Sequence, residues 1–263
     1  MDLGLKGKAA LVAGGSLGLG RAVALEFVRE GVMVAICSSN KGRLREAHAF
    51  IKDATGGQVL TIQADLTNPD QARNFVREAR SGLGRVDILV NNAGGPPATE
   101  FLSTGDDLWE SAFRLNLLST VAMTQEVVPI MKEEKGGRII NIASISVKQP
   151  IDGLILSNSI RAGVIGLAKT LSNQLAPYNI TVNSVCPGYT LTDRVRELAA
   201  ALAEKEKVDP AVIIKRWEAS IPMGRLGTPE EFAALVAFLA SERAGYLTGA
   251  AIQIDGGWYK GIM

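Results

Sequence analysis

Short apolar runs rich in valine and isoleucine recur along this chain, and amphipathic segments separate them. Runs of this length and composition predict strands that are buried on both faces of a sheet. Strands joined by helices need crossover connections, which are right-handed almost without exception and give a parallel sheet. The pattern therefore predicts a doubly wound, Rossmann-like α/β fold with helices on both faces. Seven strands are predicted, over residues 9–13, 33–37, 59–62, 86–90, 138–143, 180–186 and 250–254.

The segments between these runs have the spacing of amphipathic helices. Leu19, Val23 and Phe27 lie four residues apart, which places them on one helix face. No repeat or flexible linker interrupts the 263 residues, so we expect a single domain over 1–263. One charged stretch, 194–217, breaks the alternation and predicts two short helices inserted at about 190–220. This insertion is either a solvated helical face or a lid over a substrate pocket.

Composition excludes several classes of function. Lysine and arginine number 28 against 27 acidic residues, with no basic block, so nucleic acid is not an expected partner. No apolar stretch reaches the length of about 18 residues that a membrane span requires, and the first residues do not form a signal peptide. Cys37 and Cys186 lie inside apolar runs, which predicts buried thiols and a reducing, cytoplasmic location. His48 is the only histidine, so we expect no metal site and no Ser-His-Asp triad.

A glycine-rich stretch follows the first predicted strand and opens the first helix. It reads Gly14-Gly15-Ser16-Leu17-Gly18-Leu19-Gly20-Arg21. Glycine lets a backbone turn tightly and approach a pyrophosphate, while free N–H groups at the helix N-terminus face the negative charge. The strand-to-helix context supports ligand binding over a merely tight turn.

The glycine spacing resembles that of the short-chain dehydrogenase/reductase family, and other motifs agree in order. Asn91-Asn92-Ala93-Gly94 follows the fourth strand, Pro187-Gly188 follows the sixth, and Asp255-Gly256-Gly257 lies near the end. The likeness spans almost the whole chain and is closest to members similar to 3-oxoacyl-acyl carrier protein reductases. It implies a nicotinamide dinucleotide bound across the carboxyl ends of the strands.

The resemblance assigns cofactor contacts to positions after several strands. In the glycine loop these are Gly14, Ser16, Leu17, Gly18 and Leu19. Asp65 and Leu66 would hold the adenine, and Asn91, Ala93 and Gly94 would line the ribose and pyrophosphate. Pro187, Gly188 and Thr190 would contact the nicotinamide end, and Arg161 would hold its ribose. Ordinary turn roles are the alternative for Asn91 and Gly94.

Cofactor preference depends on the end of the second strand. An acidic residue there would pair with the free 2′-hydroxyl of NAD and repel a 2′-phosphate. No acid is present, and Ser38, Ser39, Asn40 and Lys41 offer donors to a phosphate. The sequence favours NADP over NAD, although Ser39 stands where many NADP-using relatives have arginine.

The catalytic motif departs from the family pattern. The family uses a Tyr-x-x-x-Lys pair on the helix after the fifth strand, where lysine lowers the pKa of the phenol that exchanges a proton with the substrate. Here Ser157 stands at the tyrosine position and Arg161 at the lysine position, and none of the four tyrosines has lysine four residues later. A serine hydroxyl is a weaker acid than a phenol, and guanidinium does not give up its proton.

Two other family positions are retained. Ser144 could polarise a carbonyl by hydrogen bonding, and Asn116 could position a water through its helix backbone. The alternative to a catalytic role is a strand-end turn for Ser144 and a buried polar group in a helix for Asn116. Tyr189, next to Pro187-Gly188, is a further hypothesis for the missing proton donor.

Two main functions remain open from the sequence, and different chemistry on the same scaffold, such as dehydration or isomerisation, is a third alternative. The first is an NADPH-dependent reductase of a small carbonyl substrate, or of the matching alcohol in reverse, with an altered proton donor and a 3-oxoacyl-like substrate. The second is a non-catalytic dinucleotide-binding sensor or interaction subunit. The resemblance also implies a homotetramer, in line with the apolar helix faces at 121–131 and 164–175.

Overall fold

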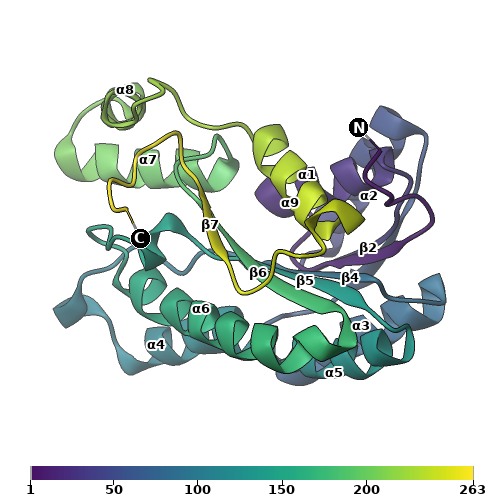
Figure 1. Ribbon diagram of the computed structural model, residues 1–263. Coiled ribbons are helices and arrows are strands. Elements are labelled where there is room, and N and C mark those ends of the chain that lie inside the picture. The colour runs from purple at the N-terminus through teal and green to yellow at the C-terminus, as the bar shows by residue number, and fades with distance from the viewer. Residues whose placement is uncertain (1, 263) are drawn as a thin grey trace.

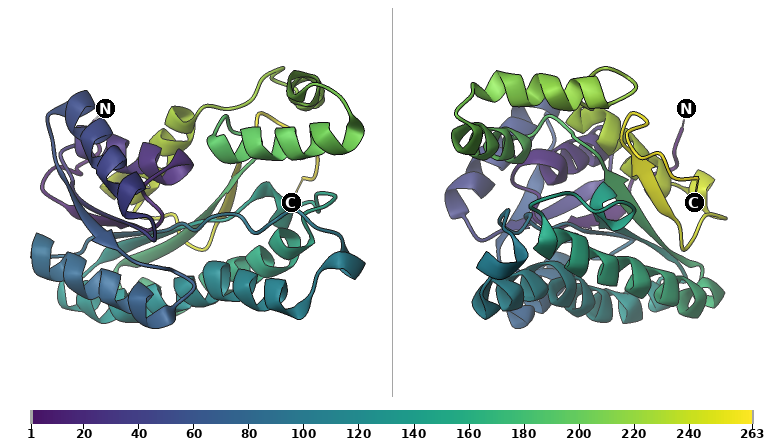
Figure 2. Two further views of the ribbon diagram at one scale, coloured as in Figure 1. Left: turned by 180° about the vertical axis from the view of Figure 1, so that it is seen from behind. Right: turned by 90° about the vertical axis from the view of Figure 1, so that its left-hand side faces the viewer.

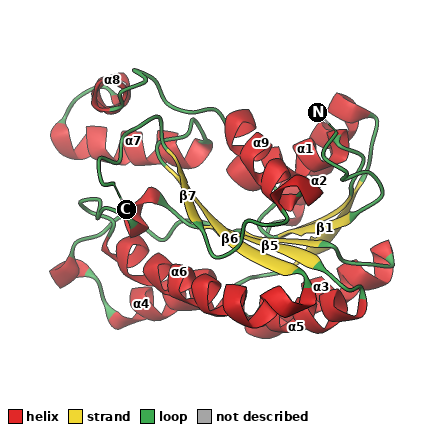
Figure 3. Ribbon diagram, in the orientation of Figure 1, coloured by secondary structure: helices red, strands yellow, loops and turns green. Residues whose placement is uncertain are grey.

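The seven predicted strands form one parallel sheet in the computed structural model, which describes residues 2–262 (Figures 1 and 3). The order across the sheet is β3-β2-β1-β4-β5-β6-β7. The predicted Rossmann-like fold is therefore confirmed, with strand bounds shifted by no more than two residues. The strands are β1 Ala9–Val12, β2 Met33–Ser38, β3 Val59–Gln63, β4 Ile88–Asn91, β5 Gly137–Ile142, β6 Ile180–Pro187 and β7 Ala251–Ile254.

Helices cover both faces of this sheet (Figures 1 and 2). On one face α1, α2 and α9 enclose a core that includes Phe27, Ile36 and Phe232. On the other face α3, α5 and α6 enclose a second core that includes Phe75 and Met131. The helices are α1 Gly18–Arg29, α2 Lys41–Thr55, α3 Pro69–Leu83, α4 Asp106–Phe113, α5 Ser119–Glu133, α6 Ile155–Leu175, α7 Asp193–Glu206, α8 Pro210–Ser220 and α9 Pro229–Ala240. Shorter helical turns are η1 Phe101–Ser103, η2 Arg114–Leu118, η3 Ile145–Val147, η4 Ala176–Tyr178 and η5 Glu242–Ala244.

The strand order reverses between β1 and β4. The chain builds β1, β2 and β3 outward in one direction and then returns to place β4 on the other side of β1, where Val12 is in register with both Ile36 and Val90. The loops that follow β1 and β4 consequently diverge to opposite faces. In open α/β sheets this switch point, outside the carboxyl ends of the strands, is where ligands bind.

The charged insertion forms two helices, α7 and α8, that project beyond the carboxyl edge of the sheet (Figures 1 and 2). They pack on each other through a small core of their own, in which Ala199, Ala203 and Ile213 are buried. Two short helices were predicted here, and two are present. Their position beside the strand ends makes them available to a ligand at that edge.

The two cysteines are buried and free, as predicted. Burial raises the pKa of Cys37 to about 12 and that of Cys186 to about 11. Both side chains therefore stay as thiols at neutral pH and act as small hydrophobic residues. Among residues 2–262 no helix is both long and apolar enough to cross a membrane.

Helix α9 begins with a capping box formed by Thr228 and Glu231. The carboxylate of Glu231 makes the stability of the fold depend on pH. Glu231 N–H donates to Thr228 Oγ1, and Glu231 Oε2 accepts from Thr228 N–H. Arg225 donates to both carboxylate oxygens, which lowers the pKa of Glu231 from 4.5 to about 2. Because the folded pKa is lowered, this stabilisation is present above pH 4.5 and is lost as the pH falls toward 2.

We expect Glu231→Gln to lower the melting temperature at neutral pH. The difference in melting temperature between the variant and the wild type should shrink as the pH is lowered from 4.5 to about 2. Thermal unfolding of both proteins across pH measures it, and Glu230→Gln, which leaves the Thr228 cap intact, is the control. A gap that stays constant down to pH 2 would contradict this account.

Candidate active site

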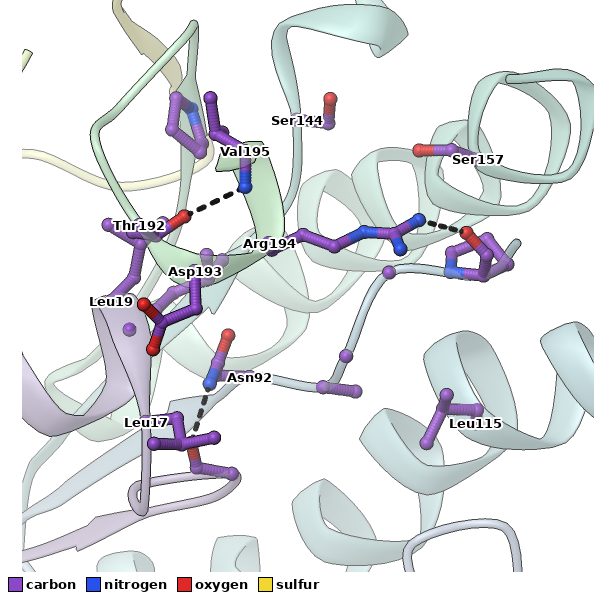
Figure 4. A pocket seen from close by; sticks show the side chains of 18 of the residues that line it. Leu17, Leu19, Asn92, Leu115, Ser144, Ser157, Thr192, Asp193, Arg194 and Val195 are labelled. Atoms are coloured by element: carbon purple, nitrogen blue, oxygen red, sulfur yellow. Dashed lines mark hydrogen bonds between the residues drawn. The ribbon is translucent and has the colours of Figure 1, made fainter. Parts of the chain in front are cut away.

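A cavity of about 560 Å³ opens at the carboxyl edge of the sheet, below α7 (Figure 4). It brings together the loops after β1, β2, β3, β4, β5 and β6, together with the first turns of α6 and α7. Most of the residues predicted for the cofactor and the catalytic site line it. They are Gly14, Ser16, Leu17, Gly18, Leu19, Ser38, Ser39, Asp65, Leu66, Ala93, Gly94, Ser144, Ser157, Arg161, Pro187, Gly188 and Thr190.

The glycine loop leaves the N-terminus of α1 open toward this cavity. Leu17 is the N-cap residue, no side chain caps the helix, and no acid lies in its first turn. Gly18 has φ +53°, in the left-handed region that favours glycine. Uncapped N–H groups at a helix start suit an anion, so the loop fits the pyrophosphate of a dinucleotide.

Gly20 allows α1 to pack directly against the loop. A Cβ atom at this position would lie 2.3 Å from Gly14 O and 2.7 Å from Asn92 Nδ2. The Asn92 amide itself donates to Ala13 O at 3.1 Å and to Gly14 O at 3.2 Å. The loop after β4 thus holds the glycine loop in place, and Figure 4 shows Asn92 beside Leu17.

At the end of β2 the structure corrects one predicted contact. Asn40 does not line the cavity, because it is the N-cap of α2 and its Oδ1 accepts from Arg43 N–H at 3.0 Å. Arg43 lines the cavity instead, together with Ser38 and Ser39. The sequence prediction missed this arginine, although its place in the first turn after the strand could have indicated it.

A second correction concerns the paired asparagines after β4. Asn91 was predicted to line the cavity, but its side chain points into the protein, where Nδ2 donates to Asn141 Oδ1 at 2.9 Å and to Thr124 Oγ1 at 3.3 Å. Asn92, the next residue, lines the cavity. Successive side chains of a strand point to opposite faces, so only one of the two can face the ligand.

Two serine hydroxyls line the cavity at the end of β5 and the start of α6. Ser144 Oγ accepts from Ser146 N–H at 3.1 Å, which caps η3. Ser157 Oγ lies 3.3 Å from Ser146 Oγ, and both of these side chains are buried. Ser146 was not predicted as a site residue. Ser146 thus contacts both Ser144, through its backbone N–H, and Ser157, through its hydroxyl.

Arg161 reaches from α6 under the loops after β4 and β5. Its Nη1 donates to Ile142 O at 2.9 Å and to Ala143 O at 3.1 Å, and its Nη2 donates to Ala93 O at 3.4 Å. Only 8% of the residue is exposed. Burial, with a smaller contribution from the charge of Arg194, lowers its pKa to about 10. The guanidinium thus stays charged at neutral pH.

Two predicted catalytic residues do not line this cavity. Asn116 is buried in η2, where Nδ2 donates to Ala112 O and the backbone oxygen accepts from Thr120 Oγ1. Tyr189 lines a separate cavity of about 350 Å³. Its ring stacks on Trp217 at 4.6 Å and meets the edge of Trp258 at 5.6 Å. These ring contacts hold its phenol outside the cavity that contains Ser144 and Ser157.

Arg194, on α7, is a further residue whose place could not be predicted. It lines the cavity, and its Nη2 donates to Pro96 O at 2.7 Å (Figure 4). The contact ties the helix pair to the loop after β4. Within residues 2–262 no three histidine, cysteine or acidic side chains are grouped so that they could hold a metal ion.

Comparisons with known proteins agree with this geometry. Residues 13–259 match the family described as enoyl-(acyl carrier protein) reductase. A 3-oxoacyl-[acyl-carrier-protein] reductase of Aquifex aeolicus is 34% identical over 98% of this chain and 100% of its own. Nodulation protein G of Azospirillum brasilense is 36% identical over 95% of this chain and 97% of its own. The crystal structure of L-sorbose reductase from Gluconobacter frateurii, complexed with NADPH and L-sorbose, superposes with a TM-score of 0.94 at 33% identity and full coverage of both chains.

The fold and the cavity thus define a Rossmann-like protein whose cavity lies at the switch point of its sheet. The chain belongs to the short-chain dehydrogenase/reductase family of oxidoreductases.

Proposed function

We propose that this protein is an NADPH-dependent reductase of a small carbonyl compound, with serine hydroxyls in place of the usual tyrosine. One observation carries the proposal. A single cavity joins the open N-terminus of α1 to two hydroxyls, Ser144 and Ser157, and to the buried cation of Arg161. A purely structural site would have no need for uncapped N–H groups at one end and grouped proton donors at the other.

The proposed roles follow from these contacts. A nicotinamide dinucleotide supplies a hydride to the carbonyl carbon when it is bound. The hydroxyls of Ser144 and Ser157 hydrogen-bond to the carbonyl oxygen, and Ser157 gives it a proton. Water entering the cavity returns a proton to Ser157 Oγ, and Ser146 Oγ, 3.3 Å away, holds the Ser157 oxygen through a hydrogen bond. The nearby Arg161 cation stabilises negative charge on these oxygens, which matters because a serine hydroxyl is otherwise a weak acid.

The residues beside Ser38 and Ser39 support NADPH over NADH. No acid follows β2, and Arg43 lines the cavity there. A guanidinium can bind a 2′-phosphate through two parallel hydrogen bonds. The L-sorbose reductase structure contains NADPH, and this supports the same choice here.

We expect Arg43→Ala to weaken NADPH binding at least about tenfold, the loss of one charge-assisted contact of roughly 1.5 kcal/mol. NADH binding should change by no more than about twofold, since NADH carries no 2′-phosphate. Calorimetric titration with both nucleotides measures this. Arg45→Ala removes the same charge from an exposed position on α2 and serves as the control. Equal losses for NADPH and NADH would contradict the assignment.

The function itself is tested by titrating the purified protein with NADPH and then following NADPH absorbance with a panel of ketones and aldehydes. Micromolar binding followed by turnover of at least one carbonyl is expected. Binding without any turnover would instead favour the dinucleotide-binding sensor or interaction subunit. No binding of either nucleotide would overturn the proposal.

The assembly and the cellular location are further parts of the proposal. The resemblance to tetrameric reductases supports a homotetramer, which light scattering tests against the 27.9 kDa of one chain. The two free, buried thiols support a reducing, cytoplasmic setting.

A further inference from the structure

The substrate end of the cavity contains an excess of positive charge. We define this end by Pro96, Leu115, Ser144, Leu154, Ser157 and Arg161, which line the cavity away from the glycine loop. Arg194 reaches into it from α7 and ends beside Pro96, with Ser157 and Ser144 on the same side in Figure 4. Both ionisable groups here are guanidinium groups.

Two of the three acids that line the cavity lie elsewhere, and the third, Glu197, forms a long ion pair with Arg194. Asp65 follows β3 at the adenosine end, and its Oδ1 accepts from Thr67 N–H and Oγ1–H. Asp193 lies beside Leu19 in Figure 4, next to the glycine loop. Glu197 Oε2 is 3.9 Å from Arg194 Nη1, longer than a hydrogen bond, and its side chain is 67% exposed. None of them neutralises Arg161.

Arg161 has hydrogen-bond partners but no counter-charge. Its three acceptors are the backbone carbonyls of Ile142, Ala143 and Ala93. Among residues 2–262 it forms no ion pair with an acid. Carbonyl acceptors satisfy N–H donors, yet a buried charge without a partner of opposite sign is costly. The reduced nicotinamide and its ribose, the parts of the cofactor that the resemblance places next to Arg161, are themselves neutral.

We propose that the substrate end binds a carboxylate, so that the substrates are oxo acids rather than neutral ketones. The inference rests on the proposed function, since it concerns the substrate of the same site. Arg194 contacts the carboxylate, and the charge of Arg161, whose guanidinium the resemblance places at the nicotinamide ribose, attracts it from the inner side. A planar guanidinium matches the two oxygens of a carboxylate. Ser144 and Ser157 can each donate a hydroxyl proton to the carbonyl oxygen, which places the acid and the ketone within one short molecule.

The test compares acids with their esters. Straight-chain 2-oxo, 3-oxo and 4-oxo acids and their methyl esters are titrated calorimetrically into the protein, both without nucleotide and saturated with NADP+, which cannot reduce them. We expect at least one acid to bind about tenfold more tightly than its ester, the effect of one charge-assisted contact. The same acid should be reduced with the larger kcat/KM.

Substitutions of Arg194 test whether its guanidinium causes the preference for the acid over the ester. Arg194→Ala should bring the acid and its ester to within about twofold of each other, while Arg194→Lys should keep part of the preference because the charge remains. Arg196→Ala removes the same charge from an exposed position on the same helix, and it should leave the preference intact.

The two proposals fail in different ways. Absence of NADPH binding to the wild type overturns the proposed function. The carboxylate site is overturned if no acid binds more tightly than its ester in either form, if the preference survives Arg194→Ala, or if a ketone phosphate binds more tightly than the matching acid.

Discussion

Gly20→Ala should weaken NADPH binding about 100-fold and lower the free energy of unfolding by about 1–3 kcal/mol. The added methyl carbon would lie 2.3 Å from Gly14 O and 2.7 Å from Asn92 Nδ2. Neither neighbour can retreat easily, because Gly14 O is backbone and the Asn92 amide holds the loop through two hydrogen bonds. The glycine loop must therefore move away from α1.

The predicted loss of affinity follows from that movement. A displaced loop no longer aims the first N–H groups of α1 at the pyrophosphate, and losing two charge-assisted hydrogen bonds of about 1.5 kcal/mol each gives about 100-fold. Calorimetric titration and chemical denaturation measure the two effects. Gly166→Ala, at a position in α6 where a Cβ has open space, is the control, and it should raise stability slightly. Unchanged NADPH affinity in Gly20→Ala would refute the loop's role.

Ser157→Ala should lower kcat at least about 100-fold and leave NADPH affinity within about twofold. Loss of a positioned proton donor typically reduces the rate by that factor or more. The substitution removes one hydroxyl at a buried position beside Ser146 and leaves the Arg161 contacts in place. Steady-state kinetics on the best carbonyl substrate, together with an NADPH titration, separate the effect on chemistry from an effect on binding.

Ser159→Ala is the matched control, since Ser159 is exposed on the same turn of α6. It should keep the wild-type kcat. If Ser157→Ala also retained full kcat, the proton would have to come from another group or from water, and the proposed role of the Ser157 hydroxyl would be wrong.

The fold could be predicted almost completely from the sequence. Buried parallel strands read as continuous apolar runs, and each of the seven runs became a strand. The backbone parts of the site could be predicted for the same reason, because the glycine loop and Pro187-Gly188 directly follow strands. Their positions depend on local sequence and on the sheet, and no distant side chain decides them.

Side-chain directions at the strand ends could not be predicted in this way. Both faces of β4 are buried, so hydrophobicity did not distinguish Asn91, which faces the interior, from Asn92. Asn40 precedes a helix and is a favourable N-cap residue, and this role competes with binding a phosphate. Tyr189 is turned away by Trp217 and Trp258, which come from segments distant in the sequence.

The three carbonyl contacts of Arg161 also oppose its exchange for the lysine that the family usually has. Its planar fork joins the loop after β5 to the loop after β4. A single ammonium on a shorter side chain cannot span the same acceptors with the same geometry. Exchanging Arg161 for lysine therefore leaves backbone oxygens unsatisfied before any tyrosine has been gained. A route that gains the lysine first therefore passes through a less stable intermediate, and the carbonyl contacts of Arg161 favour keeping the arginine.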